Sequence, residues 1–210
     1  MRYLNKIVFI NSAAIRYSEV QLDGNIHLIG TQGVGKSTIL RAILFFYNAD
    51  TQRLGIPVEK KSYQDYYFPY ADSSIIYEVA REDGWFTVLS YKTMNRICYR
   101  FIASPYRPDL FIDEEGAPYP SDRIRSVLDK NGIKYSGAIS TYEEYRNILY
   151  GNSDNKRDYS CYSLMESGSY LNIIRTIQNV LLNSRLEADY IKQTIITSLN
   201  EADSVIDLSR

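Results

Sequence analysis

The chain has very few of the residues that build disulfide frameworks and zinc sites. Its 210 residues include two cysteines, Cys98 and Cys161, and one histidine, His27. The two cysteines lie far apart and form no CxxC pattern, and a single histidine cannot complete a tetrahedral ligand set. We therefore expect neither a disulfide framework nor a zinc site.

Long apolar runs and an excess of one charge are also missing. No run approaches the roughly 18 apolar residues of a membrane-spanning helix, and the N-terminal stretch MRYLNKIVFINSAA lacks the long apolar core of a signal peptide. We expect a cytoplasmic protein without a membrane partner. The formal net charge of -1 excludes a strongly basic chain, so any contact with nucleic acid would need a local basic patch.

Tyrosine, by contrast, is abundant, with 20 residues. Tyrosine rings stack on nucleic-acid bases, but they also fill sheets and half-exposed helices, where the ring is buried and the hydroxyl finds a partner. The tyrosines are scattered along the chain and do not cluster with lysine or arginine. This distribution favours the packing role.

The residue pattern predicts an α/β protein. Short apolar runs such as IVFI and IHLI indicate two or three strands within residues 6–30, and an apolar face indicates a helix over residues 37–48. A polar linker is expected at 48–72, and an antiparallel meander of four strands, the last in DLFID, at 73–113. Further helices are predicted at 120–132, at 140–151 with Ser140 as the cap, and along most of 162–200.

The stretch GTQGVGKST fits the phosphate-binding pattern G-x-x-x-x-G-K-[ST] between the IHLI run and the first predicted helix. Glycines permit the turn that aims main-chain N–H groups at a β-phosphate, and the positive end of the helix dipole faces the same oxygens. Lys36 is expected to reach the β- and γ-phosphates, and the Ser37 hydroxyl to bind Mg²⁺. The expected contacts to the nucleotide are Gly30, Gly33, Val34, Gly35, Lys36, Ser37 and Thr38.

Hydrolysis would also need a second acidic Mg²⁺ ligand and a residue that orients water. DLFIDEEG, with Asp113 and Glu114 after a short apolar run, resembles a Walker B strand. It also fits a plain strand that ends in an acidic turn. A Walker B strand should lie parallel to the strand that feeds the phosphate loop, whereas this segment ends an antiparallel meander, and that position favours the plain strand.

The order of elements resembles the N-terminal half of an SMC-type ABC ATPase head, the class of SMC, MukB, RecF and RecN. In that class GxNGxGKS precedes a helix of the form hLxAIxFxL, and GTQGVGKSTILRAILFFY is similar, including Ala42, Ile43 and Phe45. The resemblance covers residues 1 to about 50 well and the remainder only by element order. Within the class, this stretch most resembles the large JetC/MukB-type proteins of bacterial defence and plasmid-restriction systems.

The resemblance implies a P-loop ABC-type ATPase lobe with mixed or antiparallel sheets, and C-terminal helices that lead towards a coiled coil. Residues 1–160 would form the nucleotide-binding lobe and residues 161–210 a helical segment at the root of the coiled coil. ATP and Mg²⁺ are the implied ligands, with Lys36 as the catalytic residue. The signature motif and Walker B strand would lie in a C-terminal lobe, so hydrolysis would require that lobe and a second head. DNA and kleisin-like accessory subunits are further implied partners.

Several positions depart from the pattern of the class or match it only weakly. Gln32 stands where the class has asparagine. Gln178 is the nearest match to the Q-loop glutamine, but it lies in a helical pattern. Arg53 and Arg16 are the arginines expected to approach the nucleotide or DNA, with solvated surface charge as the alternative.

Two other functions fit the same sequence. The first is a self-contained P-loop NTPase or kinase that uses Lys36 with Asp113 and Glu114 and has a substrate pocket in the 48–72 linker. The second is a nucleotide-gated interaction module without hydrolysis, in which the tyrosine-rich surface docks a partner protein.

Overall fold

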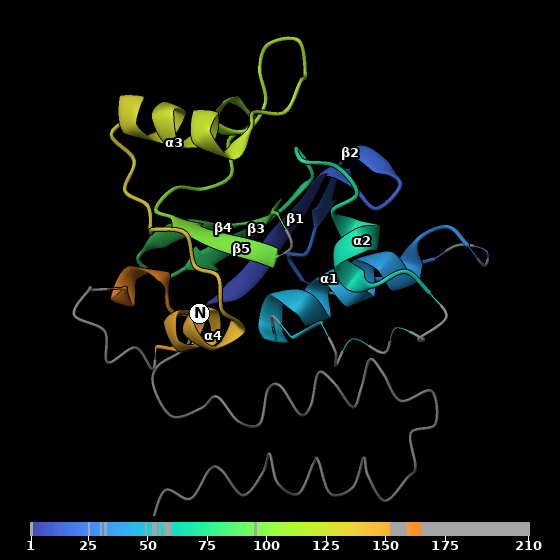
Figure 1. Ribbon diagram of the computed structural model, residues 1–210. Coiled ribbons are helices and arrows are strands. Elements are labelled where there is room, and N and C mark those ends of the chain that lie inside the picture. Colours follow the sequence, from blue (N-terminus) through green and yellow to red (C-terminus); the bar gives the residue numbers. More distant parts are fainter. Residues whose placement is uncertain are drawn as a thin grey trace, which may run out of the picture.

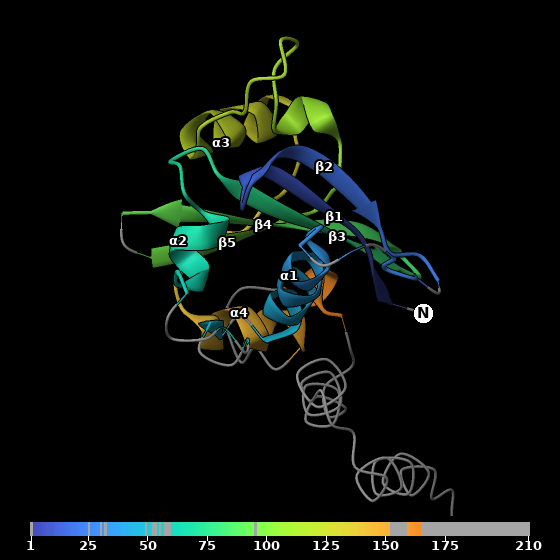
Figure 2. The ribbon, with the colours of Figure 1, turned by 90° about the vertical axis from the view of Figure 1, so that its right-hand side faces the viewer.

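A computed structural model describes the chain at residues 2–24, 26–29, 31, 33–48, 50–51, 54, 56, 60–94, 96–151 and 159–164. This part of the chain is arranged in three layers (Figures 1 and 2). A twisted sheet lies in the middle, helix α3 covers one face, and helices α1, α2 and α4 cover the other. The predicted phosphate loop leads into α1, which packs directly against the sheet.

The sheet has five strands in the order β2-β1-β3-β4-β5, and every neighbouring pair is antiparallel. Three tight hairpins join β1 to β2, β3 to β4 and β4 to β5, so the long connection from β2 to β3 carries the phosphate loop, α1 and α2. The strand bounds are Tyr3–Ser12 (β1), Ile15–Gln21 (β2), Ser74–Arg81 (β3), Gly84–Thr93 (β4) and Arg96–Ile102 (β5).

Both faces of the sheet are buried, which explains the uninterrupted apolar run of residues 7–10 in β1. Ile7 and Phe9 belong to the cluster under α1, while Val8 and Ile10 belong to the cluster under α3. Leu4 shares the face of Ile7 although the two lie three positions apart. The reason is a register shift between Leu4 and Lys6, where one extra residue in β1 returns the chain to the same face.

Four α-helices and two 3₁₀ helices accompany the sheet in the described part of the chain. The helix predicted at 140–151 is confirmed, but its cap is Thr141, whose Oγ1 accepts from the Glu144 N–H at 3.3 Å, and not Ser140. The bounds are Lys36–Asn48 (α1), Tyr63–Tyr67 (α2), Ser121–Lys130 (α3), Tyr142–Leu149 (α4), Pro108–Leu110 (η2) and Ser160–Tyr162 (η3).

Two strand predictions are wrong. Residues 26–29 form no strand; Ile29 is 90% exposed, and no described strand pairs with this segment, so an apolar run alone does not make a ladder. DLFID forms η2 and a turn, because Pro108 has no N–H to donate to a ladder and instead begins the 3₁₀ helix. The meander therefore has three strands. The 48–72 linker, in turn, contains the unpredicted helix α2, capped by Ser62.

The helical segment predicted at 161–210 lies outside the described residues apart from 161–164, as do Gln178 and the proposed root of a coiled coil. None of the helices in the described ranges has both the length and the apolar character needed to cross a bilayer.

Four tyrosine hydroxyls fix α1 to its surroundings by hydrogen bonds to its main-chain carbonyls. Burial raises the pKa of Tyr67, Tyr77 and Tyr145, so these three remain neutral donors. These rings pack in the core as the scattered tyrosine pattern predicted. The bonds run from Tyr67 to Thr38 (2.7 Å), Tyr77 to Ala42 (3.1 Å), Tyr145 to Phe46 (2.6 Å) and Tyr150 to Tyr47 (2.7 Å).

Candidate functional site

The glycine-rich stretch forms a turn that ends in the first residues of α1. Gly33 and Gly35 have φ angles of +92° and +93°. Nothing lies within 4 Å of the point where a Cβ would sit at either position, so the backbone conformation, and not a lack of space, requires glycine. The Gly35 carbonyl accepts from the N–H groups of Thr38 (3.0 Å) and Ile39 (3.2 Å), which closes the first helical turn.

Lys36, Ser37 and Thr38 present one ammonium group and two hydroxyl groups at this helix start. The Lys36 ammonium donates to the Thr31 carbonyl at 2.8 Å and so bridges the loop. Ser37 is exposed to solvent. The Thr38 hydroxyl lies 3.3 Å from the hydroxyl of Tyr66 in α2, which places a second element beside the loop.

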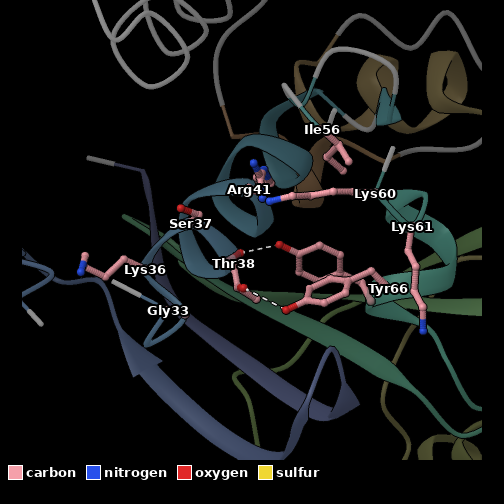
Figure 3. A pocket seen from close by; sticks show the side chains of 11 residues that line it. Gly33, Lys36, Ser37, Thr38, Arg41, Ile56, Lys60, Lys61 and Tyr66 are labelled. Atoms are coloured by element: carbon pink, nitrogen blue, oxygen red, sulfur yellow. Dashed lines mark hydrogen bonds between the residues drawn. The ribbon is translucent and has the colours of Figure 1, made fainter. Parts of the chain in front are cut away.

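A cavity of about 680 Å³ opens between the start of α1 and the segment that leads into α2 (Figure 3). This volume is typical of small-molecule sites. The lining combines two residues of the glycine turn, four cations, two tyrosines and a few small or apolar side chains. The residues are Gly33, Gly35, Lys36, Ser37, Thr38, Arg41, Ile56, Lys60, Lys61, Tyr66 and Tyr67.

The charge of this cavity favours an anion. Lys36, Arg41, Lys60 and Lys61 all line it, and the described lining residues include no carboxylate. The dipole of the α1 N-terminus adds to the positive potential. A local basic site thus exists on a chain whose net charge is -1.

The structure brings most of the predicted phosphate-loop residues together. Gly33, Gly35, Lys36, Ser37 and Thr38 all line the cavity. Val34 lies in the same turn with its side chain 58% exposed.

Gly30, Gln32 and Arg53 fall outside the described residues. Arg16 lines a neighbouring hollow of about 440 Å³, which shares Lys61 and Tyr66 with the first cavity. Arg16 therefore lies near the site without lining the main cavity.

Sequence reasoning missed Arg41, Lys60, Lys61, Tyr66 and Tyr67 as site residues. Helical spacing could have identified Arg41, because a residue four positions after Ser37 lies on the same side of the helix. The other four come from the 48–72 linker, where the self-contained NTPase alternative placed a substrate pocket without naming its residues. Only the three-dimensional structure shows that α2 lies beside the start of α1 and so brings this segment to the site.

Asp113 and Glu114 do not join this site. Asp113 lies in a tight turn, where its Oδ1 accepts from the N–H groups of Glu115 (3.1 Å) and Ala117 (2.7 Å). The preceding Phe111 packs in the cluster under α3, on the opposite face of the sheet from α1. Asp113 thus organises a turn on the other side of the sheet from the phosphate loop, as the acidic-turn interpretation expected, although a 3₁₀ helix stands where that interpretation placed a strand.

Comparison with curated proteins and with solved structures found no match. A family model described as "Protein of unknown function (DUF3584)" matches residues 12–210, which is nearly the whole chain and includes the complete site described above. The chain belongs to this family.

Proposed function

We propose that the chain is the ATP-binding N-terminal lobe of an SMC-like ATPase head, which works in the cytoplasm on chromosomal or invading plasmid DNA. The observation that carries this proposal is the glycine turn with two left-handed glycines, which leads into Lys36 and Ser37 in the lining of a cavity whose four cations include Lys36. Main-chain N–H groups, a helix N-terminus and lysine are the groups that hold a triphosphate.

The same residues fit Mg²⁺ as part of the ligand. Ser37 is exposed at the first turn of α1, where a P-loop serine supplies its hydroxyl to the metal. Bound Mg²⁺ would neutralise charge that develops on the β- and γ-phosphate oxygens. The tasks of this chain are to hold the phosphates and to orient them.

Hydrolysis needs acidic and water-orienting groups that this site does not draw from Asp113 and Glu114, which belong to the other face of the sheet. We therefore assign these groups to a C-terminal lobe and to a second head. In the full assembly DNA and kleisin-like accessory subunits are the expected partners.

Exposed apolar side chains beside the loop support the idea that more polypeptide packs here. Ile26 is 41% exposed, Ile29 is 90% exposed and Val34 is 58% exposed. Uncovered apolar groups gathered next to a binding site are typical of an interaction surface. The proposed C-terminal lobe would cover them.

Steady-state ATP turnover tests whether this chain binds ATP but needs other polypeptide to hydrolyse it. The chain alone, with Mg²⁺ and ATP, should release phosphate no faster than its Lys36→Ala variant. Asp113→Asn should leave that background unchanged. Robust turnover by the chain alone that Asp113→Asn abolishes would show instead that the chain is a self-contained NTPase.

A further inference from the structure

We propose that the cavity beside the phosphate loop holds the nucleoside end of the nucleotide, and that Tyr66 is the residue on which its base stacks. This inference rests on the proposed function, because it takes the phosphates to lie in the glycine turn. It adds a base-binding residue that lies outside the phosphate-binding motif.

The direction in which a nucleotide leaves the loop points towards Tyr66. In a P-loop the lysine reaches the β- and γ-phosphates and the serine binds Mg²⁺, so the α-phosphate and nucleoside lie away from the lysine. Lys36 and Tyr66 lie on opposite sides of Thr38 (Figure 3). The cavity extends from the glycine turn past Thr38 to Tyr66, along the path that the nucleoside would take.

Tyr66 is held in place yet keeps much of its ring accessible. Its hydroxyl lies 3.3 Å from Thr38 Oγ1, and its ring meets that of Tyr67 nearly at a right angle, with 5.1 Å between centroids. The rings therefore do not stack on each other, and Tyr66 remains 39% exposed. A positioned aromatic ring at the wall of a cavity is suited to stacking on a planar base.

The remaining walls suit the rest of a nucleotide. Arg41 lies one helical turn after Ser37, and Lys60 approaches the same part of the cavity in Figure 3. Cations at this place would face the α-phosphate and the sugar oxygens. Ile56 adds an apolar contact to the lining. The cavity thus offers positive charge near the loop and an aromatic surface at its far wall.

Titration calorimetry with two ligands separates the nucleoside from the phosphates. Mg-ATP carries both parts, and Mg-tripolyphosphate carries the phosphates alone. The variants are Tyr66→Leu, which removes the ring, Tyr66→Phe, which keeps it, and Lys36→Ala, which disables the loop. Tyr70→Leu is the matched control, because Tyr70 is an exposed tyrosine of the same segment that does not line the main cavity. Circular dichroism checks that each variant is folded.

Tyr66→Leu should weaken Mg-ATP binding about tenfold or more, as expected for loss of one aromatic–base stack, while its affinity for tripolyphosphate stays unchanged. Tyr66→Phe and Tyr70→Leu should bind Mg-ATP with affinities close to that of the wild type. Unchanged ATP affinity in Tyr66→Leu, or an equal loss for both ligands, would overturn the stacking role. With either of these results for Tyr66→Leu, the proposed function would still stand if Lys36→Ala abolished binding of both ligands. Failure of the wild type to bind either ligand would overturn both proposals.

Discussion

The Tyr67 hydroxyl donates a 2.7 Å hydrogen bond to the main-chain carbonyl of Thr38, and so joins α2 to the first turn of α1. Tyr67 is buried, and its ring stacks on that of Tyr63 with 4.1 Å between centroids. The helix that follows the phosphate loop is therefore held from its first turn by a segment some 30 residues further along the chain. The position of the loop depends on the core and not only on its glycines.

Tyr145→Phe should lower the free energy of unfolding by about 1 kcal/mol or somewhat more, because it leaves a buried carbonyl without this donor. The acceptor is Phe46 O, at 2.6 Å, in the last turn of α1, where carbonyls have no partner within the helix. Urea denaturation measures the change. Tyr142→Phe on the same helix is the control, because Tyr142 is 52% exposed. Equal stability of the two variants would contradict this role.

Alkaline pH should destabilise the fold through its buried tyrosines. Burial raises the pKa of Tyr63, Tyr77 and Tyr145 above the usual value of 10.0. Above about pH 10 the unfolded chain releases these protons and the folded chain retains them, so each group lowers the free energy of unfolding by about 1.4 kcal/mol per pH unit. Below about pH 10 these tyrosines are protonated in both states, so they do not change the free energy of unfolding with pH.

Denaturation curves at about pH 8 and at successive points above pH 10 measure this dependence. Tyr77→Phe should have a shallower alkaline slope than the wild type, because one titrating group is removed. Identical slopes would show that Tyr77 does not retain its proton in the folded state.

Much of this fold could be predicted from the sequence, because local signals decided it. The β3–β5 meander and helices α1, α3 and α4 follow from apolar periodicity and from turn residues. Residues 26–29 could not be placed correctly, because an apolar run becomes a strand only when a neighbouring strand accepts its hydrogen bonds. The strand predicted in DLFID was wrong because Pro108, just before it, begins a 3₁₀ helix in spite of the apolar residues that follow.

The site was only half predictable for a similar reason. The glycine turn, Lys36 and Ser37 form a contiguous motif, which the sequence displays directly. Tyr66 and Lys60 reach the cavity only because α2 packs on α1, a contact that includes the hydrogen bond from Tyr67 to Thr38 and the stacking of Tyr63 on Phe45. No local pattern in the sequence encodes such a long-range approach.

Asp113 should be structural and not catalytic. Asp113→Ala removes the acceptor for the N–H groups of Glu115 and Ala117 and should cost about 1 kcal/mol of stability. Asp113→Asn keeps an acceptor oxygen and should cost much less. Denaturation compares the two variants, and both should bind Mg-ATP like the wild type. Loss of nucleotide binding in either variant would refute this assignment.

Gly33→Ala should weaken Mg-ATP binding, because alanine at φ +92° carries a strain of about 1–2 kcal/mol that the loop can relieve only by changing shape. Gly116→Ala is the matched control: its φ is +79°, but it lies in the turn after Asp113, away from the cavity. Both variants should lose stability, and only Gly33→Ala should lose affinity. Equal affinities would mean that the shape of the turn does not matter for binding.

Equilibrium dialysis of Mg-ATP against the wild type, Lys36→Ala and Lys130→Ala tests the central claim most directly. Lys130 is an exposed lysine at the end of α3, on the other face of the sheet, so its loss changes the net charge equally without touching the cavity. The phosphate-binding role of the glycine turn predicts binding by the wild type and Lys130→Ala and none by Lys36→Ala. Equal binding by all three proteins, or by none of them, would contradict it.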